Sequence, residues 1–307
     1  SGNIDKSTAP DITGVAGVSR FGIPVLYITN PENKELGWEK SYIFNTGIEF
    51  ALFQSCITGS IEYYHKDGRE LLYNVSLDPT TGWTNIKKNA ASLLNKGVDI
   101  SIAAKVVAVK NFSWSTMMNF SYNYNRVKEV DYTPTQTDIL GPGNPLVGKP
   151  LNYLAVIPYL GINASGDPMI KTVNGKDTLG AANLKNFTID DYIYAGRKDP
   201  PYFGSVTNTF QYKNWKLEFF ITYKFGHKFL LPSYQNSIGS SAVNEWSDPA
   251  QTWKKAGDEK ALPYPRLING FYSNDVAYIV THNQTLVDKA DIIRLRTLSL
   301  EYNCMKL

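Results

Sequence analysis

The sequence contains a series of alternating segments joined by connections of very unequal length. The large apolar side chains of Phe112–Arg126 occupy mainly even positions, and small polar side chains occupy most odd ones. Because consecutive side chains of a strand point to opposite faces, this pattern predicts a strand with one apolar and one polar face. Trp215–Phe229 alternates in the same way, and we therefore expect an all-β protein.

Seven segments with this character are predicted to be strands. They are Ser41–Phe53, Ile57–Asp67, Asn89–Val107, Phe112–Lys128, Tyr202–Tyr212, Trp215–Phe229 and Asp288–Asn303. Residues 1–40 are rich in Gly, Pro and Asn and are expected to be irregular. Residues 243–256 are expected to form one short helix within a loop.

Short and long connections alternate strictly between these segments. Three are of hairpin length, namely Gln54–Cys56, Ala108–Asn111 and Lys213–Asn214. The others are a medium connection, Gly68–Lys88, and two long ones, Glu129–Pro201 and Leu230–Val287. Long unstructured connections are uncommon in compact soluble domains. Outer-membrane barrels, by contrast, have short periplasmic turns on one rim and long extracellular loops on the other.

The aromatic residues are spaced as in a membrane-spanning sheet. Trp114 and Trp215 follow short turns on the apolar parity, which places them in an expected periplasmic girdle. Further aromatic residues follow on this face eight to ten positions later: Tyr122, Tyr124, Tyr223 and Phe225. The apolar band of a barrel is about 25 Å tall, or roughly ten residues of tilted strand. A large soluble β-sandwich with a core rich in Tyr and Trp would also alternate.

Composition restricts the class of partner. Aromatic residues make up 13% and charged residues 19% of the 307 residues, and the net charge of +3 forms no basic block. Nucleic acid is therefore not expected as a partner. Mean hydropathy is −0.27, and no apolar run approaches the roughly 18 residues of a transmembrane helix. Cys56 and Cys304 match no metal or redox spacing and are expected to be unpaired thiols.

Seven stretches of the chain resemble the SusC/RagA-type TonB-dependent outer-membrane receptors of Gram-negative bacteria. They are Leu36–Phe53, Ile57–Val75, Pro79–Ile100, Val147–Tyr153, Pro201–Ser233, Trp253–Arg266 and Asp291–Tyr302. Their order and spacing also match, and the resemblance covers nearly the whole chain. Each motif is modest, but the set is specific.

The resemblance implies an antiparallel up-and-down transmembrane β-barrel of about 22 strands around an N-terminal plug. This chain would supply about seven of those strands. We expect residues 1–307 to be part of the barrel domain, without the plug, TonB box, signal peptide or last strands. Seven strands alone would leave both sheet edges unpaired, which lipid does not tolerate.

The implied function is active import of an oligosaccharide or peptide across the outer membrane. The implied partners are a SusD-like surface lipoprotein, the TonB complex acting through the plug, and outer-membrane lipid against the apolar face. A passive porin is the alternative within the membrane class, and a soluble secreted carbohydrate-binding β-sandwich is the alternative outside it. A folded protein that needs no detergent would favour the β-sandwich, and a full-length gene without a plug region upstream would favour the porin over an importer.

Neither a catalytic constellation nor a cofactor motif is found. His65, His227 and His282 are scattered, and the sequence lacks a nucleophile elbow and a Gly-rich phosphate loop. Gly161–Pro168 has oxygen donors at alternate positions but lacks the carboxylates of a calcium loop, so an ordinary turn is expected. We expect no enzyme, no bound metal and no cofactor.

Aromatic and acidic residues of the long connections are the candidate substrate-binding residues. Rings stack on the apolar faces of sugars, and carboxylates accept their hydroxyl protons. The candidates are Trp83, Tyr192, Tyr194, Trp246, Trp253 and Asp258. The alternative is that such residues only fix the loops to their neighbours. On the strands, the residues expected to line the lumen or contact the plug are Asn119, Ser121, Asn123, Glu218 and Lys224.

Overall fold

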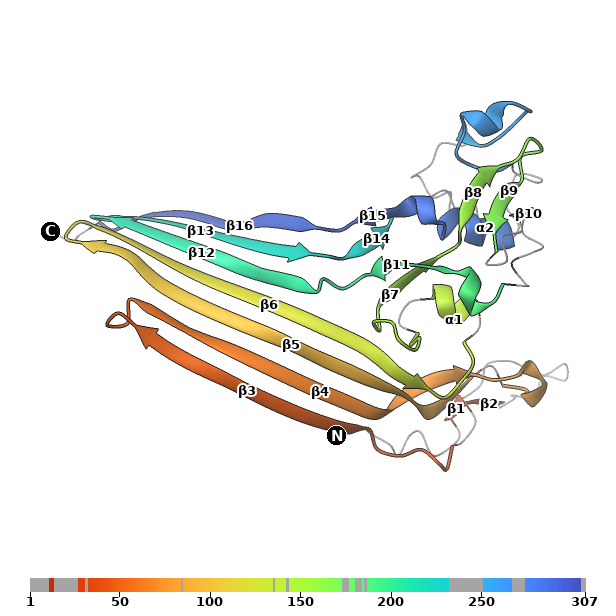
Figure 1. Cartoon of the computed structure of the whole chain (residues 1–307), viewed down its shortest axis with the longest axis horizontal. Helices are drawn as coiled ribbons and strands as arrows, with labels where there is room; N and C mark the ends of the chain where they lie inside the picture. The colour runs from red at the N-terminus through yellow and green to blue at the C-terminus, as the bar shows by residue number, and fades with distance from the viewer. Residues whose placement is uncertain are drawn as a thin grey trace.

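The computed structural model describes residues 11–13, 27–30, 33–83, 85–134, 136–141, 144–172, 177–179, 184, 187–231, 251–266 and 274–304. Its main element is a seven-stranded antiparallel sheet in the order β16-β13-β12-β6-β5-β4-β3 (Figure 1). The strands are β3 (Lys40–Leu52), β4 (Ile57–Ser76), β5 (Asn85–Val109), β6 (Phe112–Val130), β12 (Tyr202–Tyr212), β13 (Trp215–Phe225) and β16 (Ile292–Tyr302). The predicted all-β fold and its seven paired strands are confirmed, and these strands form one sheet.

Two strands extend further than the sequence pattern predicted. Most of the expected connection Gly68–Lys88 is strand, because β4 continues to Ser76 and β5 already begins at Asn85. A bulge lies within β4 between Gly68 and Leu71, where Glu70 has a φ of 55° and the register of β4 against β5 shifts. The extra residue of a bulge interrupts a strict alternation, and this is why the prediction of a connection was wrong.

Two predicted strands are each divided by a bend near the same end of the sheet. The segment Trp215–Phe229 breaks at Gly226, whose φ is 81° and whose amide donates to Asp291 Oδ1 at 2.7 Å. Beyond the bend, β14 (Lys228–Leu230) pairs with β15 (Val287–Lys289) in a separate two-stranded sheet. The predicted continuation of both strands was therefore wrong.

The register gives the main sheet two chemically different faces. Phe210 of β12 pairs with Trp114 on one side and Leu217 on the other, and their alternation assigns all three to an apolar face. The next residue, Thr209, pairs with Ser115 and Glu218 on the opposite, polar face. The predicted lumen residues all belong to the polar face: Asn119, Ser121, Asn123, Glu218 and Lys224.

Aromatic residues form a row on the apolar face beside the short turns. The Trp114 ring stacks on Phe210 at 5.5 Å between centroids, and its Nε1 donates to Asn208 Oδ1 at 3.0 Å. Trp215 contacts Tyr302 with a centroid distance of 4.7 Å. The indole N–H group of Trp114 thus has a hydrogen-bond acceptor while its ring stays on the apolar face, as in an interfacial girdle.

At the opposite end, smaller elements from the two long connections fold together into what we call the loop layer (Figure 1). It consists of α1 (Gln136–Leu140), β7 (Tyr153–Val156), β8 (Tyr159–Ile162), β9 (Pro168–Lys171), β10 (Asp177–Leu179), β11 (Ile193–Arg197) and α2 (Asn274–Thr281). Short 3-10 helices lie at Pro79–Thr81, Ile189–Asp191, Asp258–Lys260 and Gln284–Leu286. The loop layer has its own core, whose buried members are Leu140, Ile157, Ile170, Leu184 and Ile279.

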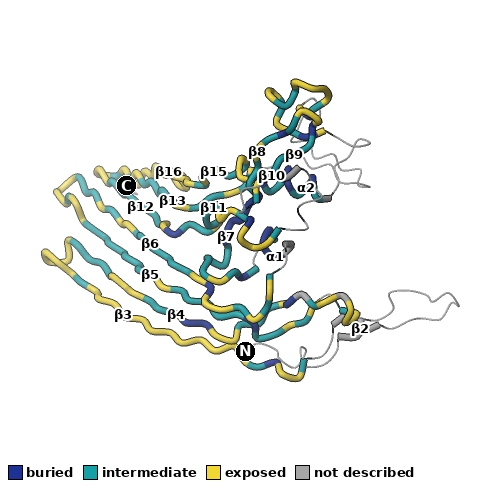
Figure 2. The backbone as a smooth tube through the Cα atoms, turned by 45° about the vertical axis from the view of Figure 1, so that its right-hand side comes forward, coloured by how far each residue is buried: buried dark blue, intermediate teal, exposed yellow. Residues whose placement is uncertain are grey.

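Burial is concentrated in the loop layer rather than in the sheet. In Figure 2 the buried segments cluster around β7 and α1, whereas β3 is exposed along nearly its whole length. β7 is buried at all four positions. Within the described residues, both faces of the main sheet are thus uncovered. This is expected for a barrel wall, whose outer face contacts lipid and whose inner face contacts a polar interior.

The loop elements were predicted less well than the sheet. Residues 1–40 were expected to be irregular, yet β1 (Asp11–Thr13) and β2 (Tyr27–Asn30) pair with each other. Of the expected helix at 243–256, residues 251–256 form no α-helix and the rest lies outside the described residues. The α-helix that the structure describes in this connection is α2, which buries Val276, Ile279 and Val280, an i, i+3, i+4 spacing. No described helix is long and apolar enough to cross a membrane.

Candidate ligand-binding site

A hollow of about 340 Å³ opens in the loop layer between α1, β7 and β11. Its lining is mainly apolar and aromatic: Val130, Pro134, Ile139, Leu146, Val147, Lys149, Tyr153, Ala155, Ile189, Asp190, Tyr192 and Tyr194. Tyr153 and Ala155 are buried, whereas Val147, Ile189 and Tyr194 are exposed. The hollow therefore has a fixed apolar floor and a solvent-accessible mouth, as small-molecule sites commonly do.

Local interactions fix both the floor and the mouth. The Tyr153 hydroxyl donates to the Ile139 carbonyl at 3.0 Å and thereby ties β7 to α1. At the mouth, Asp191 Oδ2 accepts from the Thr188 amide at 2.8 Å and from the Thr188 hydroxyl at 2.9 Å. This capping arrangement closes the 3-10 helix that presents Ile189.

Two polar groups at the hollow are the Lys149 ammonium and the Tyr192 hydroxyl. Lys149 Nζ lies 4.4 Å from the centroid of the Tyr194 ring, a cation–π contact at the mouth. The Tyr192 hydroxyl is buried and has no hydrogen-bond partner among the described residues. Burial, and then the charge of Asp191, raises the pKa of Tyr192 above its ordinary value, so its hydroxyl stays protonated. An unpaired buried donor is costly.

The structure brings two of the predicted site residues together. Tyr192 and Tyr194 both line the hollow. Trp83 instead follows the 3-10 helix between β4 and β5, where its amide donates to Thr81 Oγ1 at 3.3 Å. Trp246 lies outside the described residues.

Trp253 and Asp258 lie in one turn of the second long connection. Asp258 Oδ2 accepts from the amides of Lys254 and Lys255, both at 3.0 Å. The Trp253 ring lies against Gly166, where a Cβ atom would come within 2.5 Å of Trp253 Cε3. Trp253 Nε1 also donates to Glu259 Oε2 at 3.3 Å. In this structure both side chains are engaged in holding the loop.

Sequence reasoning did not single out Lys149, Asp190 or Val147 as site residues. Lys149 and Val147 lie in the Val147–Tyr153 motif, which had indicated only the family resemblance. Their role depends on the packing of α1 against β7, which no local pattern in the sequence shows.

The oxygen-rich segment Gly161–Pro168 forms a turn closed by Asn163. Asn163 Oδ1 accepts from the amides of Ser165 at 2.9 Å and Asp167 at 2.8 Å, an Asx-type turn. Asp167 Oδ1 pairs with Arg266 Nε at 2.9 Å. Within the described residues, no three His, Cys, Asp or Glu side chains are arranged to hold a metal ion. Cys56 and Cys304 are free and exposed.

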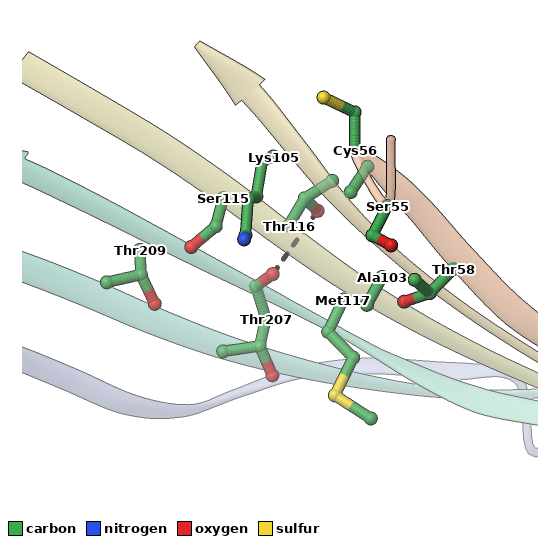
Figure 3. Close-up of a pocket in the computed structure, with 11 residues that line it drawn as sticks. Ser55, Cys56, Thr58, Ala103, Lys105, Ser115, Thr116, Met117, Thr207 and Thr209 are labelled. Atoms are coloured by element: carbon green, nitrogen blue, oxygen red, sulfur yellow. Dashed lines mark hydrogen bonds between the residues drawn. The ribbon is translucent and has the colours of Figure 1, made fainter. Parts of the chain in front are cut away.

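A second, smaller hollow of about 230 Å³ lies on the polar face near the short turns (Figure 3). Figure 3 shows hydroxyl groups and one cation along it, from Thr58, Lys105, Ser115, Thr207 and Thr209. The Thr116 hydroxyl donates to the Thr207 carbonyl at 3.2 Å. Hydroxyl groups and Lys105 thus line most of this hollow, and Ala103 and Met117 lie among them.

Lowering the pH below about 6.5 is expected to loosen the loop layer through His282. Burial, and then the charge of Lys198, lowers the pKa of His282 below its ordinary value of 6.5. The unfolded chain therefore takes up a proton that the folded chain resists, so stability present above pH 6.5 falls as the pH drops toward the folded pKa. Proteolysis of the loop layer should be faster at pH 5.5 than at pH 7.5. The variant His282→Asn should lose this dependence, and an equal dependence in both proteins would contradict the assignment.

The chain is similar in sequence to known TonB-dependent receptors. The chain is 30% identical to TonB-dependent receptor P39 of Formosa agariphila, over 88% of this chain and 30% of that receptor. It is 29% identical to TonB-dependent receptor SusC of Bacteroides thetaiotaomicron, over 61% of this chain and 19% of SusC. The chain thus spans less than a third of the length of these relatives. No protein-family model matches the chain.

Solved structures show the same fold. The structure of the RagAB peptide transporter aligns with a TM-score of 0.69 at 20% identity, over 96% of this chain and 32% of that chain. The short turns of our sheet accordingly lie at the periplasmic rim and the loop layer at the extracellular rim. The chain belongs to the SusC/RagA-type TonB-dependent receptors of the Gram-negative outer membrane, and its seven-stranded sheet is a segment of a β-barrel wall.

Proposed function

We propose that this chain is part of the later barrel of an importer that takes up an oligosaccharide or a peptide. The chain's hollow in the loop layer captures the ligand, and the polar face of the sheet lines its path. A SusD-like surface lipoprotein delivers the ligand, and a plug moved by the TonB complex opens the way. The observation that supports this proposal best is that an apolar hollow in the loop layer occurs together with a mainly polar face of the sheet.

Uptake by the full-length receptor tests this proposal. A strain lacking the receptor gene should lose growth on one class of nutrient, either oligosaccharides or peptides, and should regain it with the intact gene. Growth should also need the TonB complex, whereas a passive porin would work without it. Unimpaired growth of the deletion strain on every nutrient tested would contradict import.

Tyr194→Ala in the full-length receptor should weaken ligand binding about 10-fold, because a bound ligand would bury the Tyr194 ring and buried Tyr side chains are enriched among binding hot spots. Trp253→Ala is the matched comparison, since Trp253 is engaged with Gly166 and Glu259 and should change binding less. Titration of the purified receptor with the nutrient identified by growth measures both. If Trp253→Ala weakened binding more than Tyr194→Ala, the ligand site would lie in the second loop instead.

A further inference from the structure

The apolar face of the sheet changes character near the extracellular rim. From the level of Trp114 to the level of Tyr122, no described residue on this face is charged. Just beyond this level, the same face of β3 to β6 carries five cations: Lys40, Arg69, Lys96, Arg126 and Lys128. Because the apolar band of a barrel is about 25 Å tall, these cations lie where the outer leaflet changes from hydrocarbon to headgroup.

Three of the cations are paired with two acidic neighbours. Asp67 Oδ2 lies 2.8 Å from Arg69 Nη2, and Asp67 Oδ1 lies 3.3 Å from Lys128 Nζ. Lys40 Nζ lies 2.6 Å from Glu70 Oε1. The carboxylates thus pair with the cations on one side of the cluster. The remaining cations are Lys96 and Arg126.

Lys96 and Arg126 have no acidic partner within the described part of the chain. Both are exposed. Lys96 pairs across the sheet with Tyr124, and its Nζ lies 5.2 Å from the centroid of that ring. Arg126 is the next residue of β6 on the same face, so its Cα lies about 7–8 Å from that of Lys96. A single phosphate group can be held between two long cationic side chains at this spacing.

We propose that Lys96 and Arg126 bind a phosphorylated lipid headgroup of the outer leaflet. The tyrosines on this face, Tyr122 and Tyr124, lie at the level where amphipathic rings prefer the membrane interface. Lys96 lies level with Tyr124 and Arg126 lies one step beyond it, and both belong to the lipid-side face and not to the lumen face. Charge, level and direction therefore favour an anionic lipid over an imported ligand. The site rests on the orientation of the barrel and not on the import proposed above.

Binding of monophosphoryl lipid A to the full-length receptor in detergent tests this site, with native mass spectrometry as the readout. The double variant Lys96→Gln/Arg126→Gln should bind the lipid about 30-fold more weakly, since each cation near an anionic lipid surface contributes about a factor of five. Lys66→Gln is the matched control, because Lys66 is next to His65 on the same strand but belongs to the polar face. It should bind like the parent, and fully dephosphorylated lipid A should bind weakly to every variant.

Lys96→Arg/Arg126→Lys keeps both charges and should restore binding, which separates loss of the site from loss of the fold. Equal binding by the double Gln variant and the parent would overturn the proposal. Binding that did not depend on the phosphate group, or that fell equally in Lys66→Gln, would overturn it as well.

Discussion

Ile100→Arg is expected to lower the stability of the membrane-inserted receptor by about 2–4 kcal/mol, the cost of an arginine on the lipid face at mid-depth. Ile100 pairs with Ile61 and Phe120 in the middle of the apolar face. The cost arises because lipid cannot solvate the guanidinium group, whereas water on the other face can. Denaturant unfolding of the full-length receptor in lipid vesicles measures the difference.

Ser101→Arg is the matched control for this prediction. Ser101 is the next residue of β5 and pairs with Ser60 and Asn119 on the polar face. An arginine there faces the aqueous lumen and should change the unfolding free energy by less than about 1 kcal/mol. If the two variants were equally destabilised, the two faces of the sheet would not differ in solvent.

Tyr153→Ala is expected to destabilise the loop layer by about 3–5 kcal/mol, because it removes a buried aromatic ring from the floor of the hollow. Tyr153 is 6% exposed and packs with Ile139 and Ala155. Tyr153→Phe removes only the hydroxyl, which donates to the carbonyls of Ile139 and Asp138, and should cost about 1 kcal/mol. The ratio of the two effects thus separates packing from hydrogen bonding.

Protease cleavage of the loop layer in the intact receptor measures these two variants. The barrel itself should stay folded in both, since Tyr153 belongs to β7 and not to the main sheet. Tyr153→Ala should be cut rapidly and lose ligand binding. A cleavage rate equal to that of the parent would show that the loop layer does not depend on this core.

The main sheet could be predicted from the sequence because its restraints are local. A two-residue period, short turns and aromatic positions are all readable along one strand at a time, and the bounds of β12 were predicted without error. Errors arose where one residue breaks the period, at Glu70 in β4 and at Gly226 after β13. A single residue in the left-handed region leaves little trace in a hydrophobic pattern.

The loop layer could not be predicted in the same way. Its strands are three to five residues long, which is too short for a clear period of two, and β7 is buried at all four positions and shows no alternation. Tyr192 and Tyr194 were chosen as aromatic residues of a long loop, but that Lys149 and Ile139 lie beside them follows only from the tertiary packing. Contacts between residues far apart in sequence decide the shape of the hollow.

The central claim is that this sheet is a barrel wall with lipid on one face and water on the other. Spin labels placed singly at positions 114–122 of β6 test it directly, in the full-length receptor with Cys56 and Cys304 replaced by serine and reconstituted in lipid vesicles. Labels at even positions such as Met118 and Phe120 should collide with oxygen, and labels at odd positions such as Asn119 and Ser121 with a water-soluble nickel complex. Nickel access at the even positions, or no period of two, would contradict the account.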